Sequence, residues 1–397
     1  MAEPDVDVLI VGAGAAGAAC AETLRERGFG GSILLAGRDV DPPYERPYCS
    51  KEYLRGDVGR EGTYLALPDG LDVRTRTSVL KLDPAARTAK LAGAGDVSFG
   101  QAVLATGANV RRLRAEGSQL EGIHYLRALG NADAIRAEAA DAEHVVLVGG
   151  SYIACEVAAS LTVEGRRCTL VMPEELPLST GFGRTAGEFF AGVLREHGVE
   201  CVTGDGLERF EGADRVERVV TASGREVAGD MVVMGTGAVP DVMLARSAGL
   251  ELGESGGIAC TAELCTSADG VWAAGDACEY DSVVHGRRLR VEHWEVARAQ
   301  GAAVAAALLG EARPYDEIPY FWSDLSDWCT LEYVGPAEQW DREVVRGSVA
   351  DGAFTIFYLA RDRVAGALTV GRSDDLEEAR GLLAAGTVVD PAALAEA

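Results

Sequence analysis

An internal repeat constrains the fold of this chain more than any other feature. The stretch "DVLIVGAGAAGAACAETLRERGFGGSILLAG" from residue 7 and the stretch "HVVLVGGSYIACEVAASLTVEGRRCTLVMPE" from residue 144 follow one pattern. Gly12 corresponds to Gly149 and Gly28 to Gly165, and both pairs are 137 residues apart, so the register holds without a gap. Each copy reads as a β-branched strand, a glycine-rich turn, an amphipathic helix and a second strand. This order predicts two βαβ dinucleotide-binding units.

The first copy carries a complete GxGxxG motif formed by Gly12, Gly14 and Gly17. The first glycine permits a tight turn, the second lets the backbone approach a pyrophosphate, and the third lets the helix pack closely on the strand. The amino end of that helix then faces the phosphate charge. The alternative is a purely structural glycine turn, but the strand before the motif and the helix after it favour nucleotide binding.

The second copy keeps Gly149 but has Ser151 and Ala154 at the other two glycine positions. Both replacements are small, so we expect the second unit to bind a nucleotide if the backbone at Ser151 does not require glycine. The predicted NAD-binding residues are Gly149, Ser151, Tyr152, Ile153, Glu174 and Gly237.

Acidic residues after the second strand of each unit indicate which nucleotide binds. In the first unit Asp39 can accept hydrogen bonds from a ribose, although it could instead be a solvated turn acid. In the second unit Met172 is followed by Glu174 and Glu175, and no arginine follows closely to bind a 2′-phosphate. Two carboxylates would repel such a phosphate, so the sequence favours NADH over NADPH.

Two further stretches have the form of a strand followed by a turn of small residues. "QAVLATGANVRRL" leads to Ala105, Thr106 and Gly107, and "GVWAAGDACEYDS" leads to Gly275 and Asp276. In the second stretch the glycine allows close approach of a ligand, and the aspartate can hydrogen-bond a ribityl hydroxyl. Each pattern alone is common, but their order around the two nucleotide units is specific.

With these motifs the chain resembles the FAD-dependent pyridine-nucleotide reductases of glutathione-reductase-like fold over nearly its whole length. The resemblance implies an α/β protein with two Rossmann-like dinucleotide-binding domains, one of them discontinuous, and a C-terminal α/β domain. We expect residues 1–112 and 236–312 to form the FAD-binding domain, residues 113–235 the NAD-binding domain and residues 313–397 the C-terminal domain. The strand-like runs "TLEYVG", "FTIFYLA" and "RVAGALTVG" and the amphipathic "DDLEEARGLLAAG" support the last of these.

The stretches "PYERPYCSKEYL", "VEHWEVARAQG" and "PYFWSDL" are similar to the branch of this family that reduces ferredoxins or rubredoxins for oxygenases. The resemblance implies that Lys51 lies close to the flavin ring with Glu156 as its ionic partner. A lysine there would stabilise the negative charge that hydride transfer places on the ring. The FAD contacts that the resemblance implies, in addition to the first glycine motif, are Ala15, Asp39, Arg46, Lys51, the backbone at Val79, Ala105, Thr106, Gly107, Arg127, Gly275, Asp276, Trp294 and Trp322. Core packing for the two tryptophans and a surface salt bridge for Arg127 remain the alternatives.

Cys49 departs from this branch, which usually has an apolar residue before Ser-Lys. A thiol beside Lys51 would be more reactive toward peroxide, so an NADH peroxidase or oxidase that uses Cys49 is one rival. An apoptosis-inducing-factor-like redox-sensing flavoprotein is the other. Because the region holds one cysteine, an intramolecular disulfide there is excluded, and packing is the alternative role of Cys49.

Composition limits the remaining function classes. The nine cysteines include no CxxC pair, which removes the usual metal signatures, and we expect Cys260 and Cys265 to occupy ordinary strand positions. The net charge of −25 argues against a nucleic-acid partner. No segment is long and apolar enough for a membrane span, and the acidic start does not look like a signal peptide, so the cytoplasm is the expected location.

The resemblance also implies a small partner, a ferredoxin or a similar iron–sulfur protein, which is usually acidic. The densest basic clusters are "NVRRLR" with Arg111, Arg112 and Arg114, and "HGRRLR" with Arg287, Arg288 and Arg290. Either could steer an acidic partner despite the adverse net charge, because screening acts beyond about 10 Å. Solvated surface charge is the alternative. The sequence leaves a monomer and a homodimer equally open.

Overall fold

The computed structural model describes residues 5–396. Residues 1–4 of the predicted FAD-binding domain and residue 397 of the predicted C-terminal domain therefore lie outside the described residues. The chain forms two compact units. Among the described residues, unit 1 comprises 5–46, 63–109 and 238–319, and unit 2 comprises 47–62, 110–237 and 320–396.

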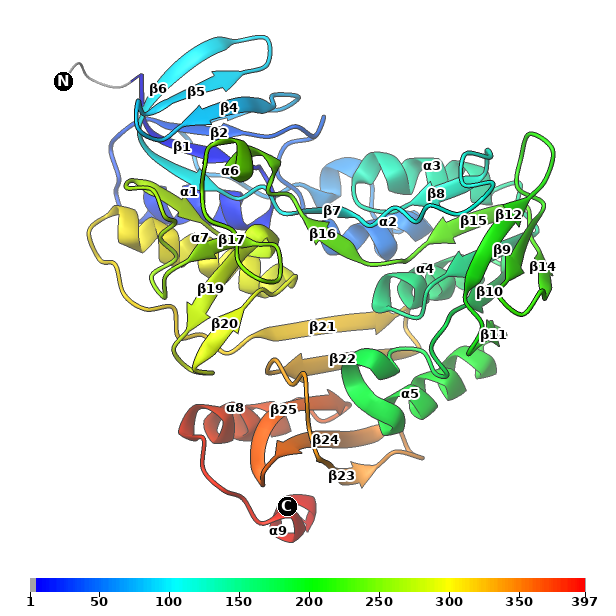
Figure 1. Ribbon diagram of the computed structural model, residues 1–397. Coiled ribbons are helices and arrows are strands. Elements are labelled where there is room, and N and C mark those ends of the chain that lie inside the picture. Colours follow the sequence, from blue (N-terminus) through cyan, green and yellow to red (C-terminus); the bar gives the residue numbers. More distant parts are fainter. Residues whose placement is uncertain (1–4, 397) are drawn as a thin grey trace. The chain divides into compact units, whose positions relative to one another are not determined.

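Unit 1 is built on a sheet with the order β3-β2-β1-β6-β5-β4, of which β1, β2, β4, β5 and β6 are labelled in Figure 1. Strand β18 pairs with β6 on the edge opposite β1. The neighbours β3, β2, β1, β6 and β18 are all parallel. The elements of unit 1 are β1 (Val6–Val11), α1 (Ala15–Glu26), β2 (Ile33–Ala36), β3 (Asp72–Arg74), β4 (Val79–Asp83), β5 (Thr88–Leu91), β6 (Gly95–Leu104), β7 (Ala108–Val110), β16 (Ala238–Pro240), α6 (Met243–Ser247), β17 (Ile258–Cys260), β18 (Val271–Ala273), the 3-10 helix η3 (Gly275–Ala277), β19 (Cys278–Ser282), β20 (Arg287–Leu289) and α7 (Trp294–Leu308).

Strand β6 is long and belongs to three ladders, with β18, β5 and β1. Its first part pairs antiparallel with β5, and its second part runs parallel to β1 with Gln101 opposite Val8. The chain leaves unit 1 at β7 and re-enters it at β16. These two strands pair with each other. Strand β17 runs parallel to β19, which pairs antiparallel with β20.

Small residues let helix α1 approach its neighbours. A Cβ at Gly17 would lie 1.9 Å from the Gly12 carbonyl oxygen, and a Cβ at Gly301 of α7 would lie 2.1 Å from the Ala16 carbonyl oxygen. Alanine, cysteine and leucine side chains of α1 join the buried core of the parallel sheet. The small residues of this helix, Gly17 and the alanines around it, therefore permit its close packing.

Unit 2 contains a second parallel sheet with the order β11-β10-β9-β15-β8. One face of this sheet, including Val146 and Val232, shares a core with Phe210 and Val219 of the antiparallel sheet β12-β13-β14. The elements up to residue 237 are η1 (Arg46–Ser50), α2 (Glu52–Arg55), η2 (Arg60–Thr63), β8 (Ile123–Tyr125), α3 (Leu129–Ala139), β9 (His144–Val148), α4 (Tyr152–Val163), β10 (Arg167–Val171), α5 (Ser179–Glu196), β11 (Glu200–Val202), β12 (Leu207–Glu211), β13 (Arg218–Thr221), β14 (Glu226–Ala228) and β15 (Met231–Met234).

The C-terminal part of unit 2 is an antiparallel sheet with the order β21-β22-β25-β24-β23. Its elements are β21 (Tyr320–Leu325), β22 (Cys329–Val334), β23 (Arg342–Ser348), β24 (Ala353–Ala360), β25 (Arg363–Val370), α8 (Asp375–Ala385) and α9 (Pro391–Glu396). The predicted runs from "TLEYVG" to "DDLEEARGLLAAG" are confirmed as β22, β24, β25 and α8, whereas β21, β23 and α9 were not predicted. Phe182 packs against this sheet with its ring centroid 5.2 Å from that of Tyr333.

Residues 47–62 form a segment that is fastened to helices α3 and α4 of unit 2. Tyr53 and Arg60 both donate hydrogen bonds to Asp133 of α3, and the Ser160 hydroxyl of α4 donates to the Ser50 carbonyl oxygen at 2.7 Å. The sequence-based boundaries had assigned this segment to the FAD-binding domain. The division into three domains stays a prediction.

The stretch around Cys260 and Cys265 differs from its prediction. Cys260 ends β17, but a turn follows, Leu264 adopts a φ of +68°, and Cys265 forms only an isolated bridge with Trp272. The stretch is therefore not one continuous strand. No disulfide joins any cysteines of the described chain. None of the helices within residues 5–396 is long and apolar enough to cross a membrane.

Candidate functional site

The glycine turn of unit 1 follows β1 and precedes α1, as predicted. Gly12 has a φ of +113°, and a Cβ there would lie 2.0 Å from the Ala105 carbonyl oxygen, so only glycine fits. A Cβ at Gly14 would meet nothing within 4 Å, which leaves open space at the amino end of α1. Ala15 begins the helix and is half-buried. This backbone can approach a pyrophosphate group, so the residues present fit a dinucleotide.

The predicted ribose acceptor Asp39 is held by two side chains of the same unit. The Tyr44 hydroxyl donates to Asp39 Oδ2 at 3.2 Å, and Arg46 Nη2 lies 3.2 Å from the same oxygen. The Asp39 side chain is 31% exposed and that of Arg46 is 25% exposed, so both can still reach a ligand. The structure thus shows a direct contact between Asp39 and Arg46, which the sequence did not predict.

The two turns of small residues lie at the ends of neighbouring parallel strands, β6 and β18. After β6, the Thr106 hydroxyl donates to the Asp241 carbonyl oxygen at 2.6 Å, and Gly107 has a φ of +69°. After β18, the Gly275 amide donates to Oε1 of Gln300, a buried residue of α7, at 2.8 Å. In the run from Ala273 to Cys278 only Asp276 is not fully buried, so its side chain can face a ligand.

The remaining predicted FAD contacts of unit 1 are half-buried positions at element ends. Val79 begins β4, and Trp294 begins α7 directly after His293. Burial lowers the pKa of His293 to about 4, so its imidazole is neutral near pH 7. Arg127 belongs to unit 2, where its backbone amide is hydrogen-bonded by the Asn131 side chain.

The glycine turn of unit 2 repeats this geometry with different residues. Gly149 has a φ of +119°, and a Cβ there would lie 2.2 Å from the Gly235 carbonyl oxygen. Ser151 has a φ of −85°, which any residue can adopt, and its hydroxyl donates to the Gly235 carbonyl oxygen at 3.1 Å. The serine therefore causes no backbone strain. Tyr152 and Ile153 open α4 and are half-buried.

Glu174 has an unsatisfied oxygen beside this turn. Its Oε2 atom is buried and has no hydrogen-bond partner among the described residues, and a Cβ built at Gly150 would lie 3.1 Å from it. A buried carboxylate oxygen without a donor is unfavourable unless a ligand supplies one. A ribose hydroxyl is such a donor, so Glu174 fits a nucleotide here. Gly237, with a φ of +86°, is exposed beyond the end of β15.

Lys51 lies in a cluster of unit 2 that combines α2, α4 and β21. Its ammonium nitrogen is 3.4 Å from Glu156 Oε1, 3.2 Å from Asp324 Oδ2 and 3.7 Å from the ring centroid of Trp322. The Lys51 side chain is 4% exposed and that of Glu156 is 7% exposed. The predicted contact between Lys51 and Glu156 is confirmed, and Asp324 is a second carboxylate that the sequence analysis missed.

Two serines hold Glu156 in place. The Ser50 hydroxyl donates to Glu156 Oε2 and the Ser323 hydroxyl donates to Glu156 Oε1, both at 2.5 Å. Glu156 lies four residues after Tyr152 on α4, about 6 Å along the helix axis. One helix therefore carries the nucleotide turn at its amino end and the partner of Lys51 one turn later.

The use of lysine in this chain is unusual. Lysine accounts for three of the 37 Lys and Arg residues, namely Lys51, Lys81 and Lys90. Lys81 and Lys90 are exposed on β4 and β5, so Lys51 is the one buried lysine. An ammonium is a compact charge and a guanidinium is a broad planar one, so the two do not substitute for each other in a confined site.

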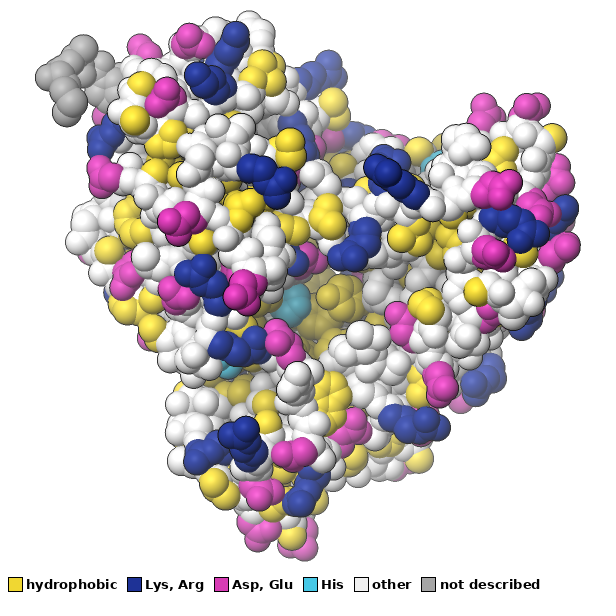
Figure 2. Space-filling view, in the orientation of Figure 1, with side chains coloured by type: hydrophobic (Ala, Val, Ile, Leu, Met, Phe, Trp, Pro, Cys, Tyr) yellow, Lys and Arg dark blue, Asp and Glu magenta, His cyan; other side chains and the backbone are white. Residues whose placement is uncertain are grey.

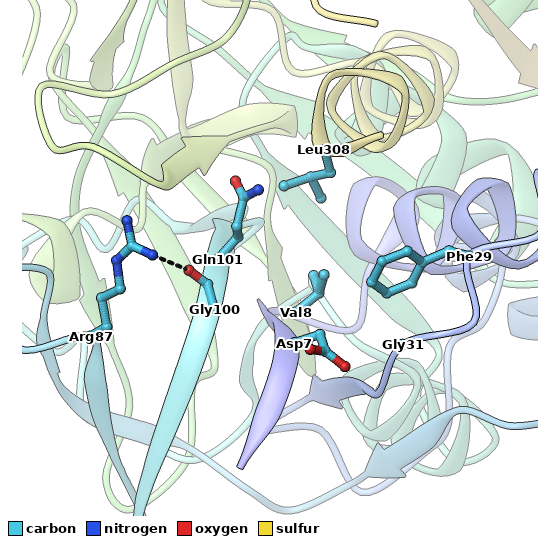
Figure 3. Close-up of a pocket in the computed structure, with 8 residues that line it drawn as sticks. All are labelled: Asp7, Val8, Phe29, Gly31, Arg87, Gly100, Gln101 and Leu308. Atoms are coloured by element: carbon cyan, nitrogen blue, oxygen red, sulfur yellow. Dashed lines mark hydrogen bonds between the residues drawn. The ribbon is translucent and has the colours of Figure 1, made fainter. Parts of the chain in front are cut away.

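Cys49 precedes this cluster in the 3-10 helix η1 and is buried, with 3% of its surface exposed. Its thiol belongs to unit 2, like Lys51. None of the predicted site residues lines the cavity of about 380 Å³ that Figure 3 shows in unit 1. That cavity lies beside Asp7, Phe29 and Arg87, and the Arg87 guanidinium donates there to the Gly100 carbonyl oxygen.

Two dinucleotide turns on separate parallel sheets, together with a buried lysine between carboxylates, define a nucleotide-dependent oxidoreductase. The chain belongs to the pyridine nucleotide-disulphide oxidoreductase family, which matches residues 6–301, and residues 320–397 match the family described as reductase C-terminal. Rhodocoxin reductase from Rhodococcus erythropolis is 33% identical over 385 residues, which cover 96% of this chain and 90% of the relative.

Solved structures agree with this assignment. A ferredoxin reductase from Rhodopseudomonas palustris has a TM-score of 0.94 and 31% identity, and the match covers 99% of this chain and 98% of that one. Putidaredoxin reductase, solved in a covalent complex with putidaredoxin, has a TM-score of 0.92 and 32% identity over 99% of this chain and 96% of that one. The α/β fold and the family resemblance predicted from the sequence are confirmed, and the chain is an oxidoreductase.

Proposed function

We propose that this protein takes hydride from NADH onto FAD and passes single electrons to a ferredoxin-type iron–sulfur protein that serves an oxygenase or a cytochrome P450. The observation that carries the proposal is the buried Lys51 ammonium, placed between two carboxylates one helical turn from a dinucleotide-binding turn. The relatives described above are named as reductases of ferredoxin-type systems, which supports the same reaction class.

In this proposal FAD supplies, when bound, the hydride acceptor and the single-electron donor. In unit 1 the glycine turn would take the pyrophosphate, Asp39 the ribose and Asp276 a ribityl hydroxyl. Lys51, with Trp322 beside it, would serve the flavin ring. The full set assigned to FAD is Gly12, Gly14, Ala15, Gly17, Asp39, Arg46, Lys51, Val79, Ala105, Thr106, Gly107, Arg127, Gly275, Asp276, Trp294 and Trp322.

The role of Lys51 is electrostatic. Its ammonium would stabilise negative charge that develops on a neighbouring ring, and a fixed charge in a site with little water acts more strongly than one in solvent. Glu156, held by Ser50 and Ser323, keeps the ammonium from moving away. Neither residue forms a covalent bond in this scheme.

NADH rather than NADPH is the proposed donor. The unsatisfied Glu174 oxygen can accept hydrogen bonds from a ribose with both hydroxyls present, whereas a 2′-phosphate would bring a second negative charge against it. The NAD-binding set is Gly149, Ser151, Tyr152, Ile153, Glu174 and Gly237.

The docking of an acidic partner is proposed to use the cluster formed by Arg111, Arg112 and Arg114. All three side chains are exposed, and within residues 5–396 none of them forms an ion pair, although Arg112 lies over the Tyr125 ring. In the other cluster Arg288 pairs with Asp281 and Arg290 with Glu292, which leaves less charge available. Figure 2 shows acidic and basic side chains interspersed over the face in view, so a local cluster matters more than net charge.

The enzyme rival, an NADH peroxidase or oxidase, would use the Cys49 thiol. Burial of Cys49 favours packing over peroxide chemistry, because an oxidisable thiol needs access. The other rival, a slow redox-sensing flavoprotein, would form a long-lived complex with NAD and show little turnover. A cytoplasmic location, and a monomer or a homodimer, complete the proposal.

Anaerobic stopped-flow mixing tests the function directly. The purified yellow protein is reduced with NADH and then mixed with an oxidised [2Fe–2S] ferredoxin or with hydrogen peroxide, while flavin reoxidation is followed. We expect fast reoxidation by ferredoxin, unchanged in Cys49→Ser. Fast reoxidation by peroxide alone, lost in that variant, would establish the peroxidase instead. A stable long-wavelength absorption band with slow reoxidation by both acceptors would establish the sensor.

A further inference from the structure

We propose that Asp324 is a positioning residue for the Lys51 ammonium and sets how much of its positive charge is compensated. The consequence for a flavin rests on the proposed function, but the positioning itself does not. The observation is that Asp324, rather than the expected partner Glu156, is the carboxylate nearer to Lys51, at 3.2 Å against 3.4 Å.

The place of Asp324 on strand β21 explains how one strand can hold an ammonium from two sides. Burial alternates along β21, so Trp322 and Asp324 lie on the same half-buried face. The ring of Trp322 and the carboxylate of Asp324 therefore both contact Lys51. The other oxygen of Asp324 accepts a hydrogen bond of 2.6 Å from the hydroxyl of Thr330, a residue of the neighbouring strand β22. This bond fixes the position of the Asp324 carboxylate.

Glu156, unlike Asp324, is held in place by two serine hydroxyls. Each of its carboxylate oxygens already accepts a 2.5 Å hydrogen bond from a serine hydroxyl, so its position does not depend on Lys51. Strand β21 is the edge strand of its sheet, and Ser323 and Asp324 point to its opposite faces. The Lys51 ammonium therefore contacts Glu156, which is held by Ser323 on one side of strand β21, and Asp324 on the other side.

The cluster contains two carboxylates and one ammonium, so it carries one negative charge in excess when all three groups are ionised. Removing the charge of Asp324 would leave Lys51 and Glu156 as a neutral pair and make the surroundings of the ammonium more positive. Asp324 also holds the ammonium inside the cluster, where the Lys51 side chain is 4% exposed and an acylating reagent has little access to it. Both the reactivity of Lys51 and the potential of a neighbouring cofactor should therefore respond to Asp324.

Because the chain has three lysines, chemical labelling can be measured separately at each of them. The full chain is treated with an amine-acetylating reagent, and the labelling rates of Lys51, Lys81 and Lys90 are compared by mass spectrometry. In Asp324→Asn we expect the rate at Lys51 to rise about tenfold relative to the two exposed lysines, because an ammonium that loses one partner of a buried ionic cluster leaves that cluster more often. Asp324→Glu should restore most of the protection.

Asp327→Asn is the matched control. Asp327 lies on the same hairpin, is exposed and forms no hydrogen bond or ion pair within the described chain, so the variant removes the same charge without touching Lys51. We expect labelling at all three lysines to remain as in the parent. An unchanged rate at Lys51 in Asp324→Asn, with the fold intact by circular dichroism, overturns the positioning role.

The second measurement is the midpoint potential of the bound flavin in the same variants. Asp324→Asn should shift it in the positive direction, and a tenfold change in the two-electron equilibrium corresponds to about 30 mV. An unchanged potential overturns the electrostatic role whatever the labelling shows. If the purified chain carries no flavin, the proposed function fails, and the labelling result still decides the role of Asp324.

Discussion

The turn after β1 and the turn after β9 begin in the same way, but different glycines then permit the close packing of the helix. Gly12 and Gly149 have φ angles of +113° and +119°, and each faces the carbonyl oxygen of a residue that follows a parallel strand. In unit 1 the helix residue is Gly17 and the residue after the strand is Ala105. In unit 2 the helix residue is Ala154, and the residue after the strand is Gly235, where a Cβ would lie 2.7 Å from the Ala154 Cβ.

In unit 1 the close approach depends on a glycine of the helix, because a Cβ at Gly17 would lie 1.9 Å from the Gly12 carbonyl oxygen. In unit 2 the helix residue Ala154 has a methyl group, and the close approach depends on Gly235, a residue that is distant in the sequence. The acids after the second strands differ too, because Asp39 is bonded by Tyr44 and Arg46 whereas one oxygen of Glu174 has no donor.

Substitution of the first glycine of either turn, Gly12 or Gly149, should have the largest effect and tests the comparison most strongly. We expect Gly12→Ala to yield a protein without flavin, because the new Cβ would overlap the Ala105 carbonyl, and Gly149→Ala to keep flavin but reduce it with NADH at least a hundredfold less efficiently. That loss corresponds to about 2.7 kcal/mol. Flavin content is measured by absorbance and reduction by stopped flow.

Gly130→Ala on α3 is the control for this pair, because its Cβ would meet nothing within 4 Å. We expect it to retain both flavin and NADH reduction. Retention of flavin by Gly12→Ala, or full NADH reduction by Gly149→Ala, would contradict the assignment of one nucleotide to each turn.

Acid should destabilise unit 1 more than unit 2, where burial also lowers the pKa of His144. Burial lowers the pKa of His293 and of His285, both in unit 1, to about 4 from an unfolded value near 6.5. Between these values the unfolded chain binds more protons than the folded chain, so this stabilisation is complete above about pH 6.5 and is lost as the pH falls through 4. Each group contributes at most about 1.4 kcal/mol per pH unit in that window.

We expect the unfolding free energy of unit 1 to fall as the pH is lowered from 7 to 4, and His285→Asn to flatten this dependence. Urea unfolding followed by hydrogen exchange resolves the two units. An equal acid slope in the parent and the variant would rule out a part for His285.

A double-mutant cycle in unit 2 tests the contact between Ala154 and Gly235. Gly235→Ala should destabilise the protein by about 1–3 kcal/mol through overpacking against Ala154. The pair Ala154→Gly with Gly235→Ala gives unit 2 the residue types of unit 1 at these two positions, and it should recover part of that loss because the Ala154 methyl group is removed. Urea unfolding of the four proteins gives the coupling, and strictly additive effects would mean that the two residues do not share one contact.

The smallest effect is expected for Glu174, the acid that follows the second strand of the unit 2 repeat. Glu174→Gln removes the charge but keeps an acceptor, so KM for NADH should rise less than about tenfold while KM for NADPH falls. Steady-state kinetics with both nucleotides measures the change in preference. The adjacent Glu175→Gln is the matched control, because that side chain is exposed, and an equal effect of both variants would mean that only the general field matters.

Local patterns predicted much of this architecture, and the misses have a common physical cause. The turns at Gly12 and Gly149 and the pair Lys51–Glu156 come from short motifs or from the resemblance they carry. Asp324, Gly235 and Gln300 escaped because each acts on a residue distant in the sequence. The strand period placed Asp324 on the face of Trp322, so that alternation was the one signal that could have found it.

Some placements could not be predicted because they depend on what packs nearby. The segment of residues 47–62 carries the motif for a flavin contact, yet its own hydrogen bonds fasten it to α3 and α4. The stretch after Cys260 alternates like a strand, but Leu264 adopts a left-handed backbone conformation and turns the chain. A side-chain pattern shows which faces are apolar and not which neighbour covers them.

The scarcity of lysine has a practical consequence for handling this molecule. Lys81 and Lys90 are opposite each other on the β4–β5 hairpin of unit 1, whereas the Lys51 amine is shielded. Reagents that couple through side-chain amines will therefore attach a dye, a bead or an electrode to one small patch of the surface. Molecules immobilised in this way would share a single orientation, so every copy would present the same face to an incoming redox partner.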